Sequence, residues 1–220
     1  MAAIVTRMTK YTVPFLGGRR ASREQPVRRM LAGVTRTSDT HPIEVQWLDA
    51  EAFSGPGRLG LTYAPGKCGR APASGIDWQR DLDTDLERLR HHHGTDVLVS
   101  LMEGFEYEDL KVPGLIECAK ARGIEVIHLP IVDGAAPSDD QAPAVIDLMN
   151  RIRAGLSAGE TVVIHCRGGQ GRTGMLAAAL LTTYGHDAEA AIATVRRAQP
   201  KAVESTTQQR YVEAFAATTP

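Results

Sequence analysis

Short apolar runs and amphipathic stretches alternate along most of the chain. Apolar and β-branched residues gather in five runs of strand length, the first of which alternates with polar residues. We therefore expect β-strands over residues 43–48, 58–63, 96–101, 124–129 and 161–165. A turn-rich link over residues 54–57 separates the first two, which predicts a hairpin at the edge of the sheet.

The stretches between these runs place apolar residues at helical spacing. The first predicted helix carries them from Trp78 to Leu89, with Asp77 as its candidate N-cap and Gly94 as its stop. Further helices are predicted over residues 113–122, 138–158, 172–184, 188–198 and 206–217. Residues 64–76 are rich in glycine and proline, and we expect a loop there that lines the rim of a site.

Strands that alternate with helices favour an α/β fold. We expect a single domain with a central, mostly parallel sheet that is flanked by helices on both faces, with the N-terminal hairpin at its edge. Ligands bind such sheets at the carboxyl ends of the strands. The strand over residues 161–165 ends directly before Cys166, so we expect the functional site at this cysteine.

Composition narrows the class of protein. With 220 residues, of which 43% are hydrophobic, the chain can bury one sizeable core. No apolar run reaches the roughly 18 residues of a membrane span, and no secretory signal pattern follows Met1. Cys68, Cys118 and Cys166 make neither a disulfide framework nor a zinc-binding spacing, which favours a reducing cytoplasm and no metal or other cofactor. We interpret the first two as ordinary reduced thiols rather than redox partners of Cys166.

Charge divides the chain into two parts. Residues 1–36 contain eight basic residues and one acidic residue, whereas the net charge of the whole chain is −1. We predict a basic, disordered extension over residues 1–42 and a catalytic domain over residues 43–220. A transit peptide, or a true start at Met30, would leave the same pattern. Aromatic residues are not interleaved with the basic ones in a way that stacks bases, so no nucleic-acid partner is expected.

The loop after the last predicted strand carries the candidate chemistry. It reads Cys166, Arg167, Gly168, Gly169, Gln170, Gly171 and Arg172, and Thr173 follows at the start of a predicted helix. Five residues between the cysteine and the second arginine allow the loop to curl until its N–H groups point to one centre. Such a ring at a helix N-terminus binds a tetrahedral oxyanion. We therefore predict that residues 167–172 bind phosphate.

Cys166 has the surroundings of a nucleophile. Cysteine attacks as the thiolate, and the positive end of the following helix, together with Arg172, favours that form. The planar guanidinium of Arg172 matches two oxygens of a phosphate. Thr173 is placed to donate a hydrogen bond to the sulfur and so help it leave. A lone buried cysteine is more often an apolar core residue, but the strand, glycines and helix around this one favour catalysis.

The segment from His165 to Thr173 resembles the signature loop of the cysteine-dependent protein tyrosine and dual-specificity phosphatases. Residues 59–66, 81–89, 111–115 and 129–134 are similar, in order, to landmarks of the kinase-associated phosphatase branch. The resemblance covers residues 58–216. It implies a dual-specificity phosphatase fold, a phosphocysteine on Cys166, a phosphorylated protein or peptide as substrate, and an orienting role for His165.

A phosphatase also needs an acid for the leaving oxygen, which typically contributes about 10²–10⁴ in rate. Asp133 follows an apolar strand and precedes Gly134, which permits loop movement, and by resemblance it matches the acid of the family. Asp139 and Asp140 are rivals, but carboxylates in the first turn of a helix also simply favour its dipole. We predict that Asp133 is the general acid and, in the second step, the general base.

Two positions near the C-terminus have alternative interpretations. By resemblance, Gln208 matches a glutamine that lies near the hydrolytic water in classical tyrosine phosphatases. Ser205 and Gln208 also have the spacing of a capping box. Glu204 stands where the family pattern would carry another glutamine, which leaves the water-positioning role open.

Two other functions remain open. Arg167 resembles the basic residue of tensin-type lipid phosphatases, whereas Gln170 replaces their second lysine, so a phosphoinositide or inositol-phosphate phosphatase is one alternative. A non-catalytic phosphoprotein-binding module is the other. The joint presence of Cys166, Arg172 and Asp133 argues against it. The sequence does not indicate an oligomeric state.

Overall fold

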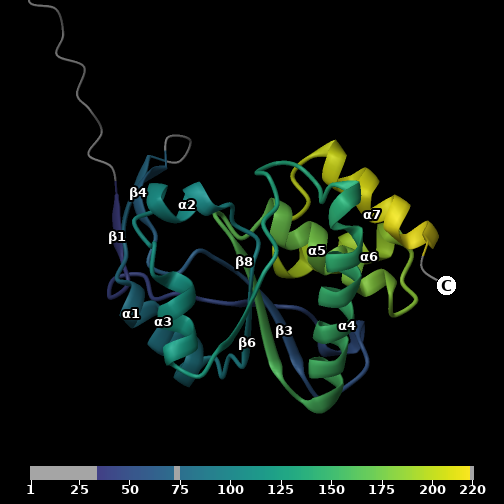
Figure 1. Cartoon of the computed structure of the whole chain (residues 1–220), viewed down its shortest axis with the longest axis horizontal. Helices are drawn as coiled ribbons and strands as arrows, with labels where there is room; N and C mark the ends of the chain where they lie inside the picture. Colours follow the sequence, from purple (N-terminus) through teal and green to yellow (C-terminus); the bar gives the residue numbers. More distant parts are fainter. Residues whose placement is uncertain (1–33, 72–74, 219–220) are drawn as a thin grey trace, which may run out of the picture. The chain divides into compact units, whose positions relative to one another are not determined.

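A five-stranded sheet forms the centre of the fold in the computed structural model, which describes residues 34–71 and 75–218 (Figure 1). In spatial order its strands are β2 (Gln46–Trp47), β3 (Arg58–Tyr63), β8 (Thr161–Cys166), β6 (Val97–Ser100) and β7 (Glu125–His128). β3, β8, β6 and β7 run parallel, while β2 pairs antiparallel with β3 at the edge. The predicted α/β fold with a mostly parallel sheet is confirmed.

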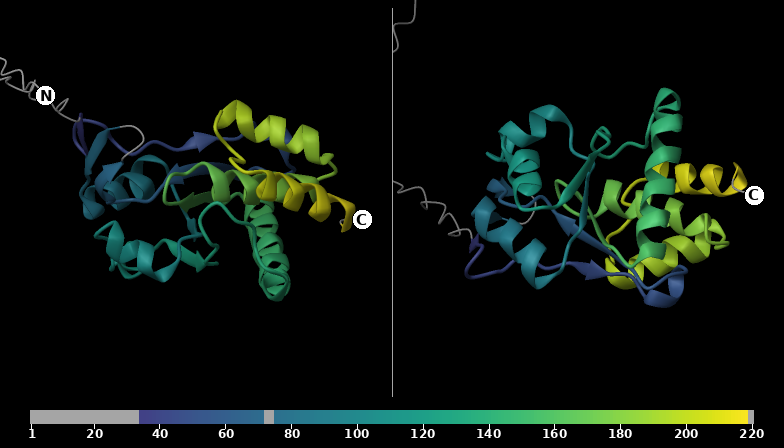
Figure 2. Two further views of the ribbon diagram at one scale, coloured as in Figure 1. Left: turned by 90° about the horizontal axis from the view of Figure 1, so that it is seen from above. Right: turned by 60° about the horizontal axis from the view of Figure 1, so that its bottom comes forward.

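Helices cover both faces of this sheet (Figure 2). One face is covered by α1 (Leu82–Glu87), α2 (Gly104–Asp109) and α3 (Leu115–Ala121), and the other by α4 (Ala142–Ala158), α5 (Gly171–Thr182), α6 (Ala188–Ala198) and α7 (Thr206–Thr218). Single turns occur at η1 (Ala50–Ala52), η2 (Arg88–His92) and η3 (Asp139–Gln141). No helix among the described residues combines the length and apolarity needed to cross a membrane.

The sheet separates two hydrophobic cores because side chains alternate along each strand. Val162 and Ile164 of β8 belong to the core that α4 to α7 complete, while Val163 belongs to the core of α1 to α3. In β6, Leu98 joins the second core and both of its neighbours join the first. Both faces of the central strands are buried, which explains why these strands are mostly apolar.

A second, three-stranded sheet corrects two expectations. Its order is β1 (Thr35–Thr37), β5 (Ile76–Gln79) and β4 (Cys68–Ala71), with β1 parallel and β4 antiparallel to β5. The expected loop over residues 64–76 therefore contains a strand. Residues 34–42, assigned above to the extension, belong to the fold, because backbone pairing with β5 holds a segment that has no apolar pattern of its own. Residues 1–33 lie outside the described part of the chain.

The first helix begins later than its apolar spacing predicts. Trp78 belongs to β5, and α1 begins only at Leu82. The N-cap is Asp81 rather than Asp77, since the Asp81 carboxylate accepts the Thr84 N–H at 2.7 Å. A spacing of four residues does not distinguish one more helical turn from a strand residue just before a helix. The short helix α2 is absent from the prediction, because its six residues are too few for an apolar period to show.

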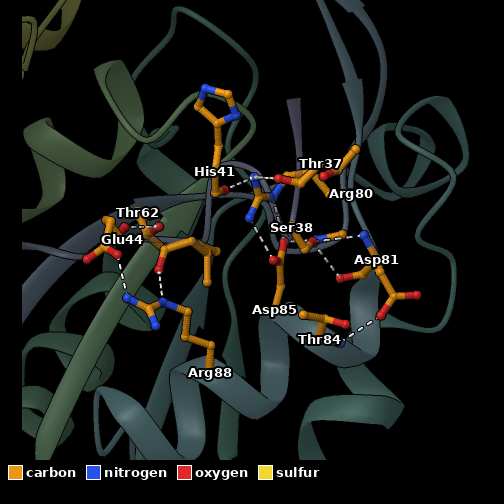
Figure 3. Close-up of polar contacts among 12 residues, drawn as sticks. Thr37, Ser38, His41, Glu44, Thr62, Arg80, Asp81, Thr84, Asp85 and Arg88 are labelled. Carbon is orange, nitrogen blue, oxygen red and sulfur yellow. Dashed lines mark hydrogen bonds and ion pairs between the residues drawn. The ribbon is translucent and has the colours of Figure 1, made fainter. Parts of the chain in front are cut away.

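A buried ion pair joins the small sheet to α1 (Figure 3). Arg80 donates two hydrogen bonds of 2.7 Å to the carboxylate of Asp85, and both side chains are at most 1% exposed. Arg80 also donates to the His41 carbonyl at 2.7 Å, and Asp85 accepts the Gly66 N–H at 2.8 Å. The pair therefore connects the segment after β1 to the segment after β3, which lies beside the end of β8.

Candidate active site

Cys166 is the last residue of β8, the central strand of the sheet. Its register partner on β3 is Tyr63, and the preceding His165 pairs with Ser100, the last residue of β6. Only 3% of Cys166 is exposed. Three parallel strands thus end together at this cysteine, which is where α/β sheets place their ligands.

The loop after Cys166 curls back toward the sulfur. The Gly169 N–H donates a hydrogen bond to Cys166 Sγ at 3.3 Å. The N–H groups of Arg167, Gly168 and Gln170 have no acceptor among the described residues. Gly169 has a φ of +71°, and a Cβ there would lie 2.5 Å from a carbonyl oxygen of β3, so only glycine fits. Unpaired donors at the N-terminus of α5 make this loop a site for an oxyanion.

Arg172 is buried and held on nearly every side. Its Nη1 and Nη2 donate to the two carboxylate oxygens of Glu106 at 2.5 and 2.8 Å. Nη1 also donates to the carbonyls of Leu101 and Ile131 at 3.2 and 3.0 Å. Nη2 lies 2.9 Å from Asp133 Oδ1. Nε is buried and has no partner among the described residues, so a phosphate on the loop would supply its acceptor.

Glu106 is the functional residue that the sequence did not reveal. Burial raises the pKa of Glu106, but hydrogen bonds from Arg172 and from the Glu103 N–H outweigh it and hold this pKa below its ordinary value. Burial lowers the pKa of Arg172, while the hydrogen bond to Glu106 and the charge of Cys166 raise it further than burial lowers it. Both groups are therefore charged. The available signal was the capping box between Glu103 and Glu106 at the start of α2.

Asp133 lies in the loop between β7 and α4, within reach of Arg172. Its side chain is 67% exposed, and one carboxylate oxygen is held by the arginine. The same guanidinium binds the Ile131 carbonyl and so fixes the base of this loop. Asp139 and Asp140 lie in η3, without an ion pair or hydrogen bond to the phosphate loop among the described residues. The fold thus brings Asp133, and neither of its rivals, to Arg172, the arginine that was predicted to bind phosphate.

His165, which precedes Cys166, and Thr173, which follows Arg172, are both fully buried. His165 Nδ1 lies 3.4 Å from the Cys166 carbonyl oxygen, which fits an orienting residue, while its Nε2 has no partner among the described residues. Burial lowers the pKa of His165 to about 4, and the nearby Arg172 charge also lowers it. The imidazole is therefore neutral at pH 7. Thr173 Oγ1 is buried without a partner, so the expected hydrogen bond to Cys166 Sγ is not formed, and the Gly169 N–H binds the sulfur instead.

The start of α7 is attached to the loop that carries the acid. Ser205 Oγ donates to the Gly134 carbonyl at 2.9 Å and accepts the Gln208 N–H at 3.1 Å. Gln208 is fully buried, and its Nε2 donates to the Ala135 carbonyl at 3.4 Å while its Oε1 accepts the Glu204 N–H at 2.9 Å. Both side-chain ends of Gln208 are therefore used to hold backbone. In this arrangement it positions the acid loop.

Glu204 rests against the first turn of α5. A Cβ at Gly171 would lie 2.4 Å from Glu204 Oε2, so the glycine lets the carboxylate approach the helix closely. Partial burial and the Asp133 carboxylate raise the pKa of Glu204, although the Gly171 N–H acts in the opposite direction. The preceding Val203 has a φ of +58°, which is rare for a β-branched residue, and Arg196 binds its carbonyl at 3.1 Å. Backbone strain of this kind gathers at functional sites, and here it fixes the position of Glu204 beside the candidate site.

A hollow of about 370 Å³ adjoins the phosphate loop. Its lining includes Lys67, Arg70, Trp78, Asp109 and Arg167. Arg167, which directly follows the nucleophile, contacts Asp109 at 3.5 Å. Among residues 34–71 and 75–218, no three His, Cys, Asp or Glu side chains gather in a group that could hold a metal ion.

Known proteins with similar sequences are phosphatases or regulators of kinases by name. The family model Tc-R-P, a polymorphic toxin system DSP-PTPase phosphatase, matches residues 75–186. Cyclin-dependent kinase inhibitor 3 of Sus scrofa is 31% identical over 140 residues, which is 64% of this chain and 61% of the relative. A phosphatidylinositol 3,4,5-trisphosphate 3-phosphatase of Dictyostelium discoideum is 27% identical over 66% of this chain and 22% of its own length. The chain thus spans about three fifths of the length of the kinase inhibitor 3 proteins.

Solved structures agree with this assignment. Kinase associated phosphatase, crystallised with serine in place of its catalytic-site cysteine, matches with a TM-score of 0.70 at 25% identity, over 80% of this chain and 94% of that one. Tk-PTP in its active form matches with a TM-score of 0.60 at 26% identity, over 79% and 97% of the two chains. Because the family model spans about half of the chain and these structures share its fold, the chain belongs to the DSP-PTPase phosphatases, the dual-specificity group of the cysteine-dependent protein tyrosine phosphatases.

Proposed function

We propose that this protein hydrolyses phosphomonoesters of phosphorylated proteins or peptides through a phosphocysteine on Cys166. The unpaired donors around the sulfur carry the proposal. Arg172 Nε and three N–H groups of the loop have no acceptor among the described residues. Arg172 Nε is buried, and buried polar groups are normally paired, so a ligand with several oxygens would supply its acceptor and could also accept the loop N–H groups. The likeness to kinase associated phosphatase supports a phosphoprotein as the source of that ligand.

The reaction has two steps. The Cys166 thiolate attacks phosphorus, so that an S–P bond forms while the P–O bond to the leaving group breaks. The loop N–H groups and Arg172 stabilise the equatorial oxygens, and Asp133 gives its proton to the leaving oxygen. Water then attacks the phosphocysteine, Asp133 takes a proton from it, and the S–P bond breaks to release phosphate and the thiolate. One water is consumed for each phosphate released.

The nucleophile is tested by Cys166→Ser, with Cys118→Ser as the matched control. Cys118 lies in α3, on the face of the sheet that α1 to α3 cover. With an aryl phosphate, we expect no measurable turnover by Cys166→Ser and wild-type turnover by Cys118→Ser. Residual turnover by Cys166→Ser would show that another group attacks phosphorus.

A phosphoinositide phosphatase is the second candidate function, and Arg167 is the observation that favours it. Its side chain is 44% exposed beside the nucleophile, where it can meet a second phosphate of the substrate. A panel of phosphotyrosine peptide, phosphothreonine peptide and phosphoinositide separates the two functions. We expect a higher kcat/KM for a peptide. Faster turnover of the phosphoinositide would replace our first proposal.

We also infer a cytoplasmic location. The three cysteines of the chain, all in the described part, are free thiols. Free thiols of this kind persist in reducing compartments, which supports this location.

A further inference from the structure

We propose that the hollow beside the phosphate loop is a second anion-binding subsite, which takes a further phosphate or carboxylate of the same phosphopeptide. This inference rests on the proposed function and narrows its substrate class to phosphopeptides with a second acidic group close to the reacting phosphate. The subsite is the cavity of about 370 Å³ lined by Lys67, Arg70, Trp78, Asp109 and Arg167.

Positive charge is in excess in this cavity. Three cations, Lys67, Arg70 and Arg167, face one carboxylate, Asp109. The Arg167–Asp109 contact is long, at 3.5 Å, and both side chains are about half exposed, so it neutralises little. Within residues 34–71 and 75–218, the side chains of Lys67 and Arg70 have no ion pair or hydrogen bond. The subsite therefore has room and unpaired charge for one further anion.

Lys67 is the deepest of the three cations. It is only 8% exposed, and its Nζ lies 4.0 Å from the centre of the Trp78 ring and 4.2 Å from that of Tyr63. Buried lysines are almost always paired with a carboxylate. Burial lowers the pKa of Lys67 to about 7; Arg80 and Arg167 also lower it, while Cys166 and Asp85 act in the opposite direction. An anion bound in the cavity would supply the missing partner.

The backbone around Lys67 is fixed on both sides. The Gly66 N–H binds the Asp85 carboxylate of the buried ion pair. The Lys67 carbonyl accepts the backbone N–H of Arg80 at 3.4 Å. Figure 3 shows the side chains of Arg80 and Asp85. On the other side, the Cys68 N–H binds the Leu110 carbonyl at 2.8 Å. A cation held in this way loses little conformational entropy when an anion binds.

The cavity is continuous with the phosphate loop. Arg167 and Gly168 of the loop line it, and the Arg167 carbonyl accepts the Ala64 N–H at 3.5 Å, three residues before Lys67. A substrate whose phosphate lies on the loop therefore places its neighbouring groups at the mouth of the cavity.

The charges favour a peptide over an inositol headgroup. Arg70 and Arg167 already outnumber the single carboxylate of Asp109, and an anion bound in the cavity would favour the charged form of Lys67 as well. A headgroup with several phosphates would need more cations. The phosphate loop carries the neutral Gln170 and no further cation at that position. Trp78 and Leu110 add an apolar wall, which suits peptide side chains.

The test compares three phosphopeptides that differ at one residue beside the reacting phosphate. This residue is Glu, Gln, or a non-hydrolysable phosphonate analogue of phosphoserine, and the phosphonate separates a preference for phosphate from one for carboxylate. We measure kcat/KM for each peptide with the full-length wild type, Lys67→Met and Arg70→Gln. Lys120→Met, an exposed lysine of α3 outside the cavity, is the matched control.

We expect the wild type to prefer a peptide with a second anion by about tenfold, which corresponds to about 1.4 kcal/mol. The ratio of kcat/KM for the peptide with a second anion to kcat/KM for the Gln peptide should fall toward one in Lys67→Met and in Arg70→Gln. It should stay unchanged in Lys120→Met. Arg70 is exposed, so its substitution tests the subsite even if Lys67→Met folds poorly. A wild-type ratio near one, or a ratio that survives both substitutions, would overturn the proposal.

Binding to Cys166→Ser separates this proposal from the proposed function. Calorimetric titration of this variant with the same peptides measures the anion preference without turnover. If no peptide is hydrolysed but the binding preference depends on Lys67, the function is wrong and the subsite stands. If peptides are hydrolysed and bound without preference, the subsite is wrong and the function stands. A Lys67-dependent preference for phosphoinositides over every peptide would assign the cavity to a lipid headgroup and overturn the peptide assignment.

Discussion

At the scale of single residues, the site depends on side chains that each serve two purposes. Arg172 uses both of its terminal nitrogens for Glu106, for two carbonyls and for Asp133, and keeps only Nε for the substrate. A lysine could not do this, because a guanidinium has five donors in a rigid plane and an ammonium has three. The same contacts hold Asp133 beside Arg172, as its proposed role of general acid requires.

Asp133→Asn tests the acid. We expect kcat to fall by about 10²–10⁴ for substrates with poor leaving groups and by much less for good ones, since a good leaving group departs without a proton. Steady-state rates for a series of aryl phosphates with graded leaving-group pKa measure this. Asp139→Asn is the matched control and should behave as the wild type. An equal loss across the series would place the acid elsewhere.

His165 should make stability depend on pH. Its pKa is about 4 in the folded protein, whereas its ordinary value is 6.5, so between these two pH values the unfolded chain binds one more proton than the folded chain. The contribution of neutral His165 to the free energy of unfolding is therefore complete above pH 6.5. It falls by about 3 kcal/mol as the pH is lowered toward 4. Urea unfolding at a series of pH values measures this. His165→Asn should lose clearly less stability over the same range, and an equal loss would contradict the assignment.

At the scale of elements, the phosphate loop is supported from α2 and α7 as well as from its own strand and helix. α2 contributes Glu106, whose carboxylate caps its own helix and binds Arg172. The start of α7 holds the acid loop through Ser205 and Gln208. Both elements act through backbone and buried side chains, so they position the reacting groups without touching the substrate.

Glu106→Ala tests the support from α2. Removing one partner of a buried ion pair leaves the other charge uncompensated, so we expect the free energy of unfolding to fall by about 3–5 kcal/mol. The remaining folded enzyme should have a raised KM, because Arg172 loses its fixed orientation. Glu108→Ala, in the same helix but exposed, is the control and should change stability by less than about 0.5 kcal/mol. Comparable losses in the two variants would contradict the role of Glu106.

At the scale of the whole molecule, a second, smaller sheet includes the first described strand of the chain. β1 pairs with β5, and the carbonyl of His41 accepts a hydrogen bond from the buried Arg80. These contacts include residues 34–42 in the folded domain, which was expected to begin at residue 43. They also connect the N-terminal segment to the position of Lys67, through the ion pair of Arg80 with Asp85.

Truncation tests this boundary. A chain that begins at residue 34 should keep the unfolding temperature of the full chain. In a chain that begins at residue 43, the free energy of unfolding should fall by about 1–3 kcal/mol, because Arg80 then has an unpaired donor. Each kcal/mol lowers the unfolding temperature by about 2–4 °C in a domain of this size. Calorimetry of the three chains measures the difference. Equal unfolding temperatures would restore the boundary at residue 43.

The sequence by itself determined what depends on neighbours along the chain. Apolar runs revealed the strands of the central sheet, since burial on both faces leaves no polar alternation to hide them. The phosphate loop was equally local: Cys166, its glycines and Arg172 lie within seven residues, at the end of a strand and the start of a helix. Asp133 was predicted from its place after an apolar strand and from the resemblance to a family.

Only the tertiary structure decided what depends on residues far apart in the chain. Glu106 is 66 residues from Arg172, and nothing local marks it as more than a helix cap. The hollow around Lys67 is formed by segments after β3, in β4 and β5, in α2 and after β8. β1 has no apolar pattern and is held by backbone pairing with β5 and by the Arg36 guanidinium over the Trp78 ring. The periodicity of apolar residues shows which face of one element is buried. Ion pairs, cavities and edge strands form where several elements meet. They therefore follow from the packing of the elements and not from the pattern of any single one.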